Sequence, residues 1–182
     1  MEHSDTGQKL FLKKLKDYIG TLEEDIFKTK FIELLQHKDA FQRTHLPGHI
    51  TGSAFIVSED NSQTLLVHHA KLNKWLQPGG HADGDVDMAR VAMREANEET
   101  GLQNLMLTSQ EIFDLDIHII PTRKDFPEHE HYDVRYLFKA SPSEKIIVSE
   151  ESHDVKWIKL SDLEKYNNES SILRMRDKLL VK

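Results

Sequence analysis

The chain has 182 residues, with 24 Lys and Arg against 31 Asp and Glu, so its formal net charge at pH 7 is −7. The absence of cysteine excludes disulfides, thiolate metal sites and thiol nucleophiles. The acidic balance disfavours long nucleic acids and anionic membranes, because both attract surfaces rich in Lys and Arg.

No apolar run approaches the roughly 18 residues that span a bilayer. The first residues also lack the basic and apolar parts of a signal peptide. We therefore expect a cytoplasmic protein whose length suits one domain with a small appendage.

The first 45 residues predict two helices. Apolar residues at helical spacing predict a helix over residues 8–20 that ends at Gly20. Thr21 is a typical helix N-cap residue, and the acidic residues after it favour a second helix. The pattern breaks at residues 43–48, so we expect an N-terminal helical extension, residues 1–45, before a domain over residues 46–182.

After this boundary the apolar pattern becomes that of strands. Runs over residues 50–57 and 64–69 predict a hairpin, with a turn at residues 59–62. A helix is expected over residues 85–100, followed by strands near 111–120, 131–139 and 153–159 and a helix over 169–180. Strands on both sides of a central helix indicate an α+β domain or a layered α/β/α domain.

Three carboxylates gather on the helix predicted over residues 85–100. Glu95, Glu98 and Glu99 follow i, i+3, i+4 spacing and therefore converge on one patch. A bound Mg²⁺ or Mn²⁺ would turn their mutual repulsion into coordination. Gly79 and Gly80 precede the helix and let the backbone approach a ligand closely. A solvated acidic helix face is the alternative reading of the carboxylates alone.

The segment from Gly80 to Leu102 resembles the signature of the Nudix hydrolase family, G-x5-E-x7-R-E-U-x-E-E-x-G-U, in which U is apolar. Gly80 opens the signature, and the run from Arg94 to Leu102 matches its second half at every fixed position. One position departs, because Val86 stands where the signature has its first Glu, and Asp85 lies one residue earlier. The resemblance covers about residues 46–160 and implies the Nudix fold, an α/β/α sandwich with a mixed β-sheet.

The resemblance implies divalent-metal-dependent hydrolysis of the pyrophosphate bond in a nucleoside diphosphate linked to another group. It assigns Mg²⁺ or Mn²⁺ binding to a backbone carbonyl of the glycine pair and to three carboxylates: Gly80, Glu95, Glu98 and Glu99. Arg94 would orient these carboxylates, and the identity of the general base stays open. The departure at Val86 leaves an alternative, a catalytically weak Nudix module that binds a nucleotide as a sensor or scaffold.

Polar residues alternate along the strand predicted over residues 131–139. His131, Asp133 and Arg135 share one face, which suggests a wall of the substrate cleft with Arg135 paired to a phosphate. The strand near residues 111–120 carries a matching polar row. The alternative is a strand with one polar face whose groups satisfy one another.

Two further histidine positions suggest binding roles. His81 adjoins the glycine pair and either contacts substrate or stabilises the turn, and a ring titrating near its ordinary pKa of about 6.5 would make activity sensitive to pH. His129 and His131 occupy alternate strand positions, which can share a transition metal, although spacing fixes no third ligand. The expected partners are a small nucleotide derivative and, because Nudix enzymes are often dimers, a second copy of the chain. The N-terminal extension is then either a dimer contact or a lid.

Overall fold

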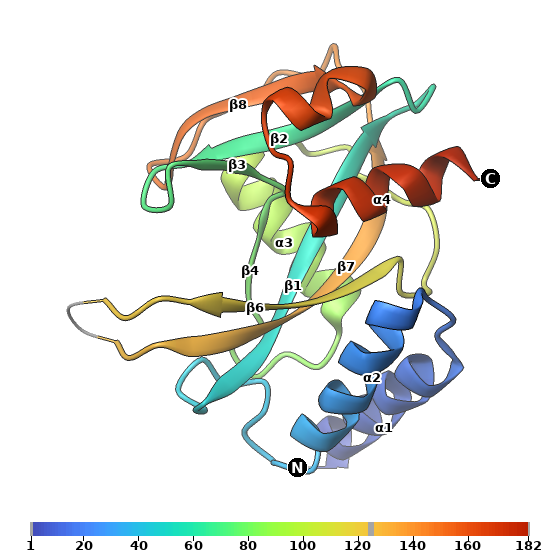
Figure 1. Ribbon diagram of the computed structural model, residues 1–182, viewed down its shortest axis with the longest axis vertical. Helices are drawn as coiled ribbons and strands as arrows, with labels where there is room; N and C mark the ends of the chain where they lie inside the picture. Colours follow the sequence, from blue (N-terminus) through green and yellow to red (C-terminus); the bar gives the residue numbers. More distant parts are fainter. Residues whose placement is uncertain (1, 124–125, 182) are drawn as a thin grey trace.

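The computed structural model describes residues 2–123 and 126–181 (Figure 1). In chain order the elements are α1 (Glu2–Asp17), α2 (Leu22–Leu34), β1 (Gly48–Ser58), β2 (Gln63–His69), β3 (Lys74–Leu76), β4 (Gly79–His81), α3 (Met88–Thr100), β5 (Met106–Leu107), β6 (Asp114–Ile120), β7 (His129–Ala140), β8 (Ser152–Lys159), the 3₁₀ helix η1 (Leu160–Lys165) and α4 (Ser170–Leu180).

Within the described residues the strands form one mixed sheet. Its main order is β3-β2-β1-β7-β5, with β4 paired to β1, β6 to β7 and β8 to β2. The central pair, β1 and β7, is parallel, and the other pairs are antiparallel. The long parallel pair carries most of the side chains discussed below.

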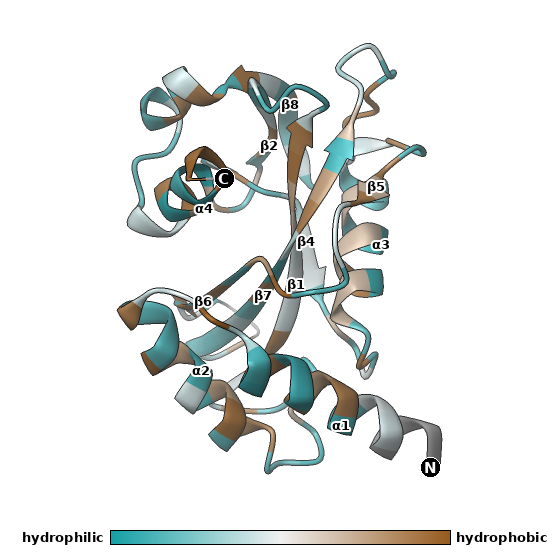
Figure 2. Cartoon of the chain, turned by 90° about the vertical axis from the view of Figure 1, so that its right-hand side faces the viewer, coloured by the Kyte–Doolittle hydropathy of each residue, from teal (hydrophilic) through white to brown (hydrophobic). Residues whose placement is uncertain are grey.

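Helices cover both faces of this sheet, with α3 on one side and α4 on the other (Figure 2). Residues of β1 alternate between two hydrophobic clusters because successive side chains of a strand point to opposite faces. Ile56 belongs to the cluster that includes α3, and Phe55 to the cluster that includes η1 and α4. The α/β/α sandwich with a mixed sheet is therefore confirmed.

The predicted β1–β2 hairpin and the C-terminal helix are confirmed, and two helix ends differ from prediction. Helix α1 ends at Asp17 rather than Gly20, and a Cβ on Gly20 would lie 2.8 Å from the Tyr18 ring and 2.9 Å from Glu24. Helix α3 begins at Met88, because the Asp87 side chain accepts a hydrogen bond from the Arg90 N–H and caps the helix. The short strand β5 and η1 lack a periodic signal and were not predicted.

The N-terminal helices are joined to the sheet through a buried carboxylate. Glu24 completes a capping box with Thr21 and lies at 0% exposure. It accepts hydrogen bonds from Tyr18, from Lys178 of α4 and, at 3.1 Å, from the Leu115 N–H of β6. Helix α2 is thereby tied to β6 and α4, and the division at residue 45 stays a prediction.

We expect Glu24 to make the protein sensitive to acid. Burial alone would raise the pKa of Glu24, but hydrogen bonds from Lys178, the Thr21 N–H and Tyr18 outweigh burial and lower the pKa to about 2. The lowered pKa contributes stability that is fully present above pH 4.5, the ordinary value, and is lost as the pH falls toward 2. In urea unfolding, Glu24→Gln should lower the free energy of unfolding at pH 7 by about 2–3 kcal/mol and weaken its dependence on acid.

The matched control is Glu23→Gln, because Glu23 lies in the same helical turn but is exposed and pairs with Arg174 at 2.7 Å. Exposed ion pairs contribute about 0–1 kcal/mol. Equal losses in the two variants would contradict the assignment of the acid sensitivity to Glu24.

None of the helices in the described part of the chain is long and apolar enough to cross a membrane.

Candidate active site

The glycine pair and the carboxylates of α3 are in direct contact. Strand β4 pairs with β1 and holds Gly80 opposite Gly52. A Cβ on Gly80 would lie 2.3 Å from Glu95 Oε2, so any larger residue at this position would displace the Glu95 carboxylate. The Gly79 N–H donates a hydrogen bond of 3.1 Å to Glu99 Oε1.

Arg94 links two of the carboxylates to the glycine turn. Its Nη1 lies 2.7 Å from Glu95 Oε1 and 3.5 Å from Glu98 Oε2. Its Nη2 donates a hydrogen bond of 2.9 Å to the His81 carbonyl. A planar guanidinium can hold several acceptors in fixed directions. The structure thus brings together Gly80, Arg94 and the three carboxylates, which we call the acid cluster (Glu95, Glu98 and Glu99).

The charge of the acid cluster is poorly compensated within the protein. Glu99 is 9% exposed, and burial together with repulsion by other carboxylates raises its pKa to about 8 despite the hydrogen bond from Gly79. Burial also raises the pKa of Glu95, although Arg94 opposes the change. Carboxylates whose ionised form lacks charge compensation suit hard divalent cations such as Mg²⁺ and Mn²⁺, which supply that compensation when they bind. The donor set therefore fits the metal that the resemblance implies.

A fourth carboxylate near this cluster was not predicted. Glu151, on the loop between β7 and β8, raises the pKa of both Glu95 and Glu99 by charge repulsion. It lies far along the chain from α3, so no helical spacing signals its approach. Its carbonyl also accepts a hydrogen bond from the Ala70 N–H at 2.9 Å, which holds the loop near β2.

A polar face lies on the side of β1, β6 and β7 away from α3. His131, Asp133 and Arg135 share this face, opposite the row Asp114, Asp116 and His118 on β6. Strand β1 pairs with β7 on its other side. The register of this pair places a further polar row on the same face: His49, Thr51 and Ser53. The two predicted rows are thus adjacent.

Arg135 is engaged within this face. It is 2% exposed and donates to Asp133 at 2.8 Å, to Asp114 at 3.2 Å and to Asp116 at 3.0 Å. Asp133 also accepts hydrogen bonds from the hydroxyls of Thr51 and Ser53. This geometry matches the alternative in which polar groups satisfy one another, so the pairing of Arg135 with a substrate phosphate stays a prediction that its contacts do not favour.

Histidine rings gather at one end of the polar face. The His81 ring centroid lies 5.1 Å from those of His49 and His131. Burial, aided by the charge of Arg43, lowers the pKa of His81 to about 4. Burial and neighbouring histidines lower the pKa of His131 to about 2. The expectation that His81 titrates near its ordinary pKa is therefore wrong, because the ring has lost most of its hydration.

A family model described as the NUDIX domain matches residues 48–178. The chain belongs to the Nudix family. The match contains the acid cluster, Arg94 and the glycine pair, and so agrees with the resemblance found in the signature. The chain is accordingly a Nudix hydrolase.

Solved structures of Nudix proteins have the same fold. A hydrolase of the NUDIX family from Clostridium perfringens is 27% identical with a TM-score of 0.57, and the alignment covers 74% of this chain and 98% of that one. A C. elegans Ap4A hydrolase in a binary complex gives a TM-score of 0.59 at 18% identity, covering 72% and 95%. The E. coli dihydroneopterin triphosphate pyrophosphohydrolase gives 0.56 at 12% identity, covering 73% and 96%. No curated protein sequence matches the chain.

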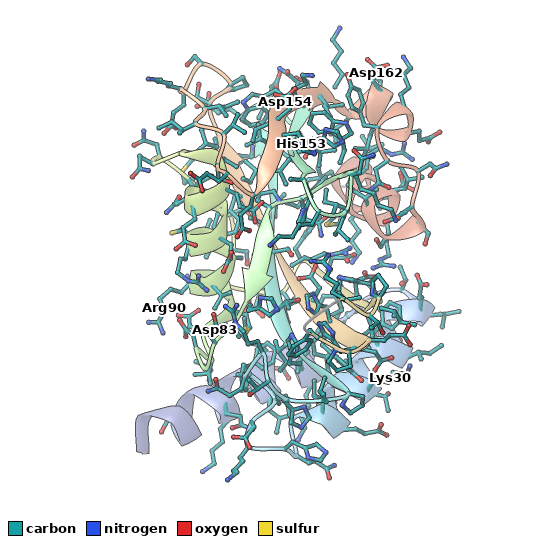
Figure 3. All side chains as sticks on the ribbon, turned by 90° about the vertical axis from the view of Figure 1, so that its left-hand side faces the viewer. Lys30, Asp83, Arg90, His153, Asp154 and Asp162 are labelled. Carbon is teal, nitrogen blue, oxygen red and sulfur yellow. The ribbon has the colours of Figure 1, made fainter. Side chains whose placement is uncertain are left out.

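The departure from the Nudix signature has a structural explanation. Val86 packs against the main hydrophobic cluster, and a Cβ on Gly7 of α1 would lie 2.3 Å from Val86 Cγ2. Asp85 accepts hydrogen bonds from the Arg90 guanidinium at 2.7 and 2.6 Å, so its carboxylate is paired with Arg90. Figure 3 shows Arg90 and Asp83 beside the first turn of α3, and Arg90 forms its ion pair with Asp85 there.

We expect the affinity of this Nudix site for Mg²⁺ to rise with pH. A cation binds the ionised carboxylate, and the raised pKa of Glu99, about 8, keeps this group protonated at neutral pH in the free protein. Binding at pH 7 should therefore release a proton, and the affinity should increase up to about pH 8. Calorimetry of Mg²⁺ binding in buffers of different ionisation enthalpy measures the proton release. Binding without proton release at pH 7 would contradict the prediction.

Proposed function

We propose that this Nudix hydrolase uses Mg²⁺ or Mn²⁺ to hydrolyse the pyrophosphate bond of a nucleoside diphosphate linked to another group. The observation that carries the proposal is the acid cluster, held by Arg94 against Gly80. Its charge excess and its signature together favour a cation and a polyphosphate over any neutral substrate.

A divalent cation bound there supplies neutralisation of the pyrophosphate oxygens and acidification of a bound water. In the proposal Glu98 and Glu99 are the main ligands, and Glu95 is a ligand or the general base that takes the proton of the attacking water. Arg94 keeps the carboxylates in place through its contacts with Glu95, Glu98 and the His81 carbonyl. Glu151 is a further candidate for the base, because its charge acts on two members of the cluster.

The substrate that we propose is a small nucleotide derivative. The C. elegans neighbour is an Ap4A hydrolase and the E. coli neighbour a dihydroneopterin triphosphate pyrophosphohydrolase, so this fold accepts several compounds with phosphoanhydride bonds. On this chain His81 and His131 are the proposed contacts for the organic part of the substrate. Asp133 and Arg135 remain candidates, but both are buried and already paired with each other, so these contacts do not favour them.

The experiment is a cleavage panel of nucleoside triphosphates, nucleotide sugars, ADP-ribose, dinucleoside polyphosphates and coenzymes, with Mg²⁺ or Mn²⁺ and with EDTA as control. We expect one class to be cleaved and the cleavage to be lost with EDTA. Binding of a nucleotide without cleavage of any compound would instead favour the catalytically weak module. Cleavage that persists in EDTA would contradict the proposed metal dependence.

A further inference from the structure

Three histidines of the polar face form a compact triangle. His49 of β1 lies opposite His131 of β7 in the strand register, and His129 lies two residues before His131. Each pair of their ring centroids is 5.0 Å apart. One nitrogen from each ring lies within 4.8 Å of the others. The parallel pairing of β1 and β7 thus supplies the third histidine that sequence spacing did not fix.

Backbone carbonyls fix the orientation of two of these rings. The Nδ1 of His49 lies 3.2 Å from the His45 carbonyl, and the Nδ1 of His129 lies 2.8 Å from the Pro127 carbonyl. A carbonyl can only accept, so each Nδ1 carries the proton and each Nε2 of the neutral ring has a lone pair. The His129 Nε2 accepts from the His131 Nε2 at 3.2 Å, so the proton on the His131 Nε2 must leave that atom when a cation binds. Metal-binding histidines usually have this arrangement, with the second nitrogen donating to a carbonyl or carboxylate.

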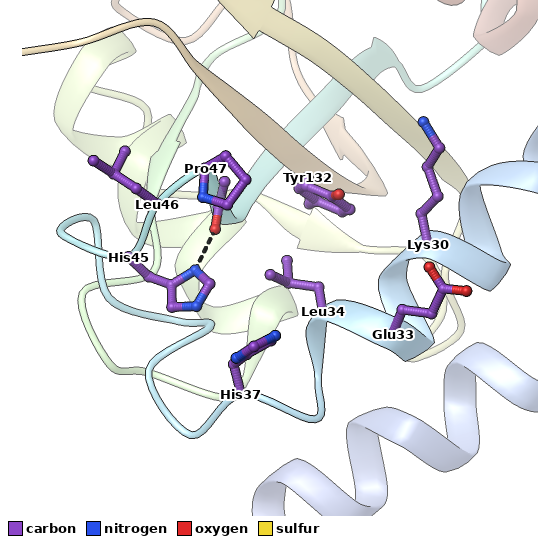
Figure 4. Close-up of a pocket in the computed structure, with 9 residues that line it drawn as sticks. Lys30, Glu33, Leu34, His37, His45, Leu46, Pro47 and Tyr132 are labelled. Atoms are coloured by element: carbon purple, nitrogen blue, oxygen red, sulfur yellow. Dashed lines mark hydrogen bonds between the residues drawn. The ribbon is translucent and has the colours of Figure 1, made fainter.

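The loop before β1 is itself held in place. His45 lies on this loop beside Pro47, and the dashed line in Figure 4 marks its hydrogen bond to the Gly48 carbonyl, 2.6 Å long. The carbonyl that orients His49 is therefore part of a fixed turn. The hydrogen bond to that carbonyl therefore sets the orientation of the His49 ring.

The Nε2 atom of His49 is buried and has no hydrogen-bond partner among the described residues. A buried polar atom without a partner is costly, and such atoms in folded proteins usually have an explanation. The lone pair of this atom belongs to a ring that neighbours two more imidazoles. A cation at the centre of the triangle would give the Nε2 lone pair of His49 a partner.

We propose that His49, His129 and His131 bind one Zn²⁺ ion, at a site separate from the acid cluster. Zinc prefers imidazole nitrogen at about 2.0–2.1 Å, whereas Mg²⁺ and Mn²⁺ prefer oxygen. Tetrahedral ligands at that distance are about 3.3 Å apart. The Nε2 atoms of His129 and His131 are already 3.2 Å apart, and the ligand atoms of all three residues lie within 4.8 Å of one another, so binding brings the His49 nitrogen closer to the other two.

Three protein ligands leave one position of a tetrahedral zinc for water or another group. Another histidine of the described residues, His81, has its ring centroid 5.1 Å from those of His49 and His131. In this proposal His131 gives its nitrogen to the ion rather than directly to substrate. The zinc site stands on its own geometry and does not depend on the proposed hydrolysis.

The test measures Zn²⁺ binding by calorimetry and elemental analysis on the full chain without a histidine tag, after metal removal by a chelator. Excess Mg²⁺ occupies the acid cluster during the titration. We expect one tightly bound Zn²⁺ per chain, and at least 100-fold weaker binding in His129→Gln and in His131→Gln. The matched controls are His153→Gln, an exposed histidine on β8, and Glu98→Gln in the acid cluster, and both should bind zinc as the wild type does.

Two results would overturn the proposal. One is the absence of stoichiometric binding to the wild type, and the other is binding that survives both histidine changes but is lost in Glu98→Gln. If circular dichroism shows that the histidine variants are unfolded, Co²⁺ substitution of the wild type decides. Intense visible bands of tetrahedral cobalt support the site, and the weak bands of octahedral cobalt contradict it.

Discussion

Glu98→Gln is expected to lower kcat/KM by on the order of 100- to 1,000-fold on the compound that the cleavage panel identifies. The substitution removes a proposed metal ligand, and the charge stabilisation that a catalytic cation supplies amounts to several kcal/mol. The Glu98 side chain is 60% exposed and lies 3.5 Å from Arg94, so glutamine fits without disturbing the core. Steady-state rates and thermal unfolding, measured together, separate loss of chemistry from loss of fold.

The matched control is Glu59→Gln, an exposed glutamate in the turn after β1, which should leave the rate unchanged. Loss of activity in both variants would indicate a general effect of charge. Activity like that of the wild type in Glu98→Gln would overturn its assignment as a metal ligand. The remaining assignments in the acid cluster would then need revision, because Arg94 contacts Glu98 and Glu95 together.

Arg135→Met is expected to destabilise the protein by about 3–5 kcal/mol, because it leaves buried carboxylates without their shared cation. The guanidinium pairs with Asp114, Asp116 and Asp133, and its side chain is 3% exposed. For a chain of this size the loss corresponds to a fall in Tm of roughly 6–20 °C. Urea unfolding at pH 7 measures the change in the free energy of unfolding.

Arg176→Met serves as the control, because Arg176 pairs with two exposed carboxylates, Glu164 and Asp177. Such pairs contribute about 0–1 kcal/mol. A second variant, Arg135→Met with Asp116→Asn, should recover part of the loss by removing one unpaired charge. A cost for Arg135→Met no larger than that of Arg176→Met would show that the polar face does not depend on Arg135.

Local patterns were sufficient to predict the longer helices and strands and the acid cluster, but not the short elements β5 and η1. The carboxylates of α3 lie at i, i+3, i+4, so one helix brings them together whatever the rest of the chain does. The polar row on β7 was predicted for the same reason, because alternation along a strand decides which face each side chain takes. The Nudix signature then added the fold, which periodicity had left open between two architectures.

Contacts that join distant segments could not be predicted from spacing. Glu151 approaches α3 from a loop, and His49 meets His131 through strand pairing. The partners of Arg135 were visible in the sequence as two polar rows, but its complete burial depends on α4, whose Ser171 carbonyl also accepts from Arg135 at 3.4 Å. A strand pattern shows which face is polar and does not show what covers that face.

The contact between Gly7 and Val86 changes how the N-terminal helices relate to the rest of the chain. A position that the Nudix signature gives to a carboxylate is occupied here by an aliphatic side chain that packs beside α1. Lys14 of α1 adds a second attachment, a hydrogen bond of 2.7 Å to the Gln110 carbonyl. Helix α1 is therefore attached to the signature loop at Val86 and to the segment between β5 and β6 at Gln110, so a substitution at Gly7 or at Val86 alters a contact that both residues share.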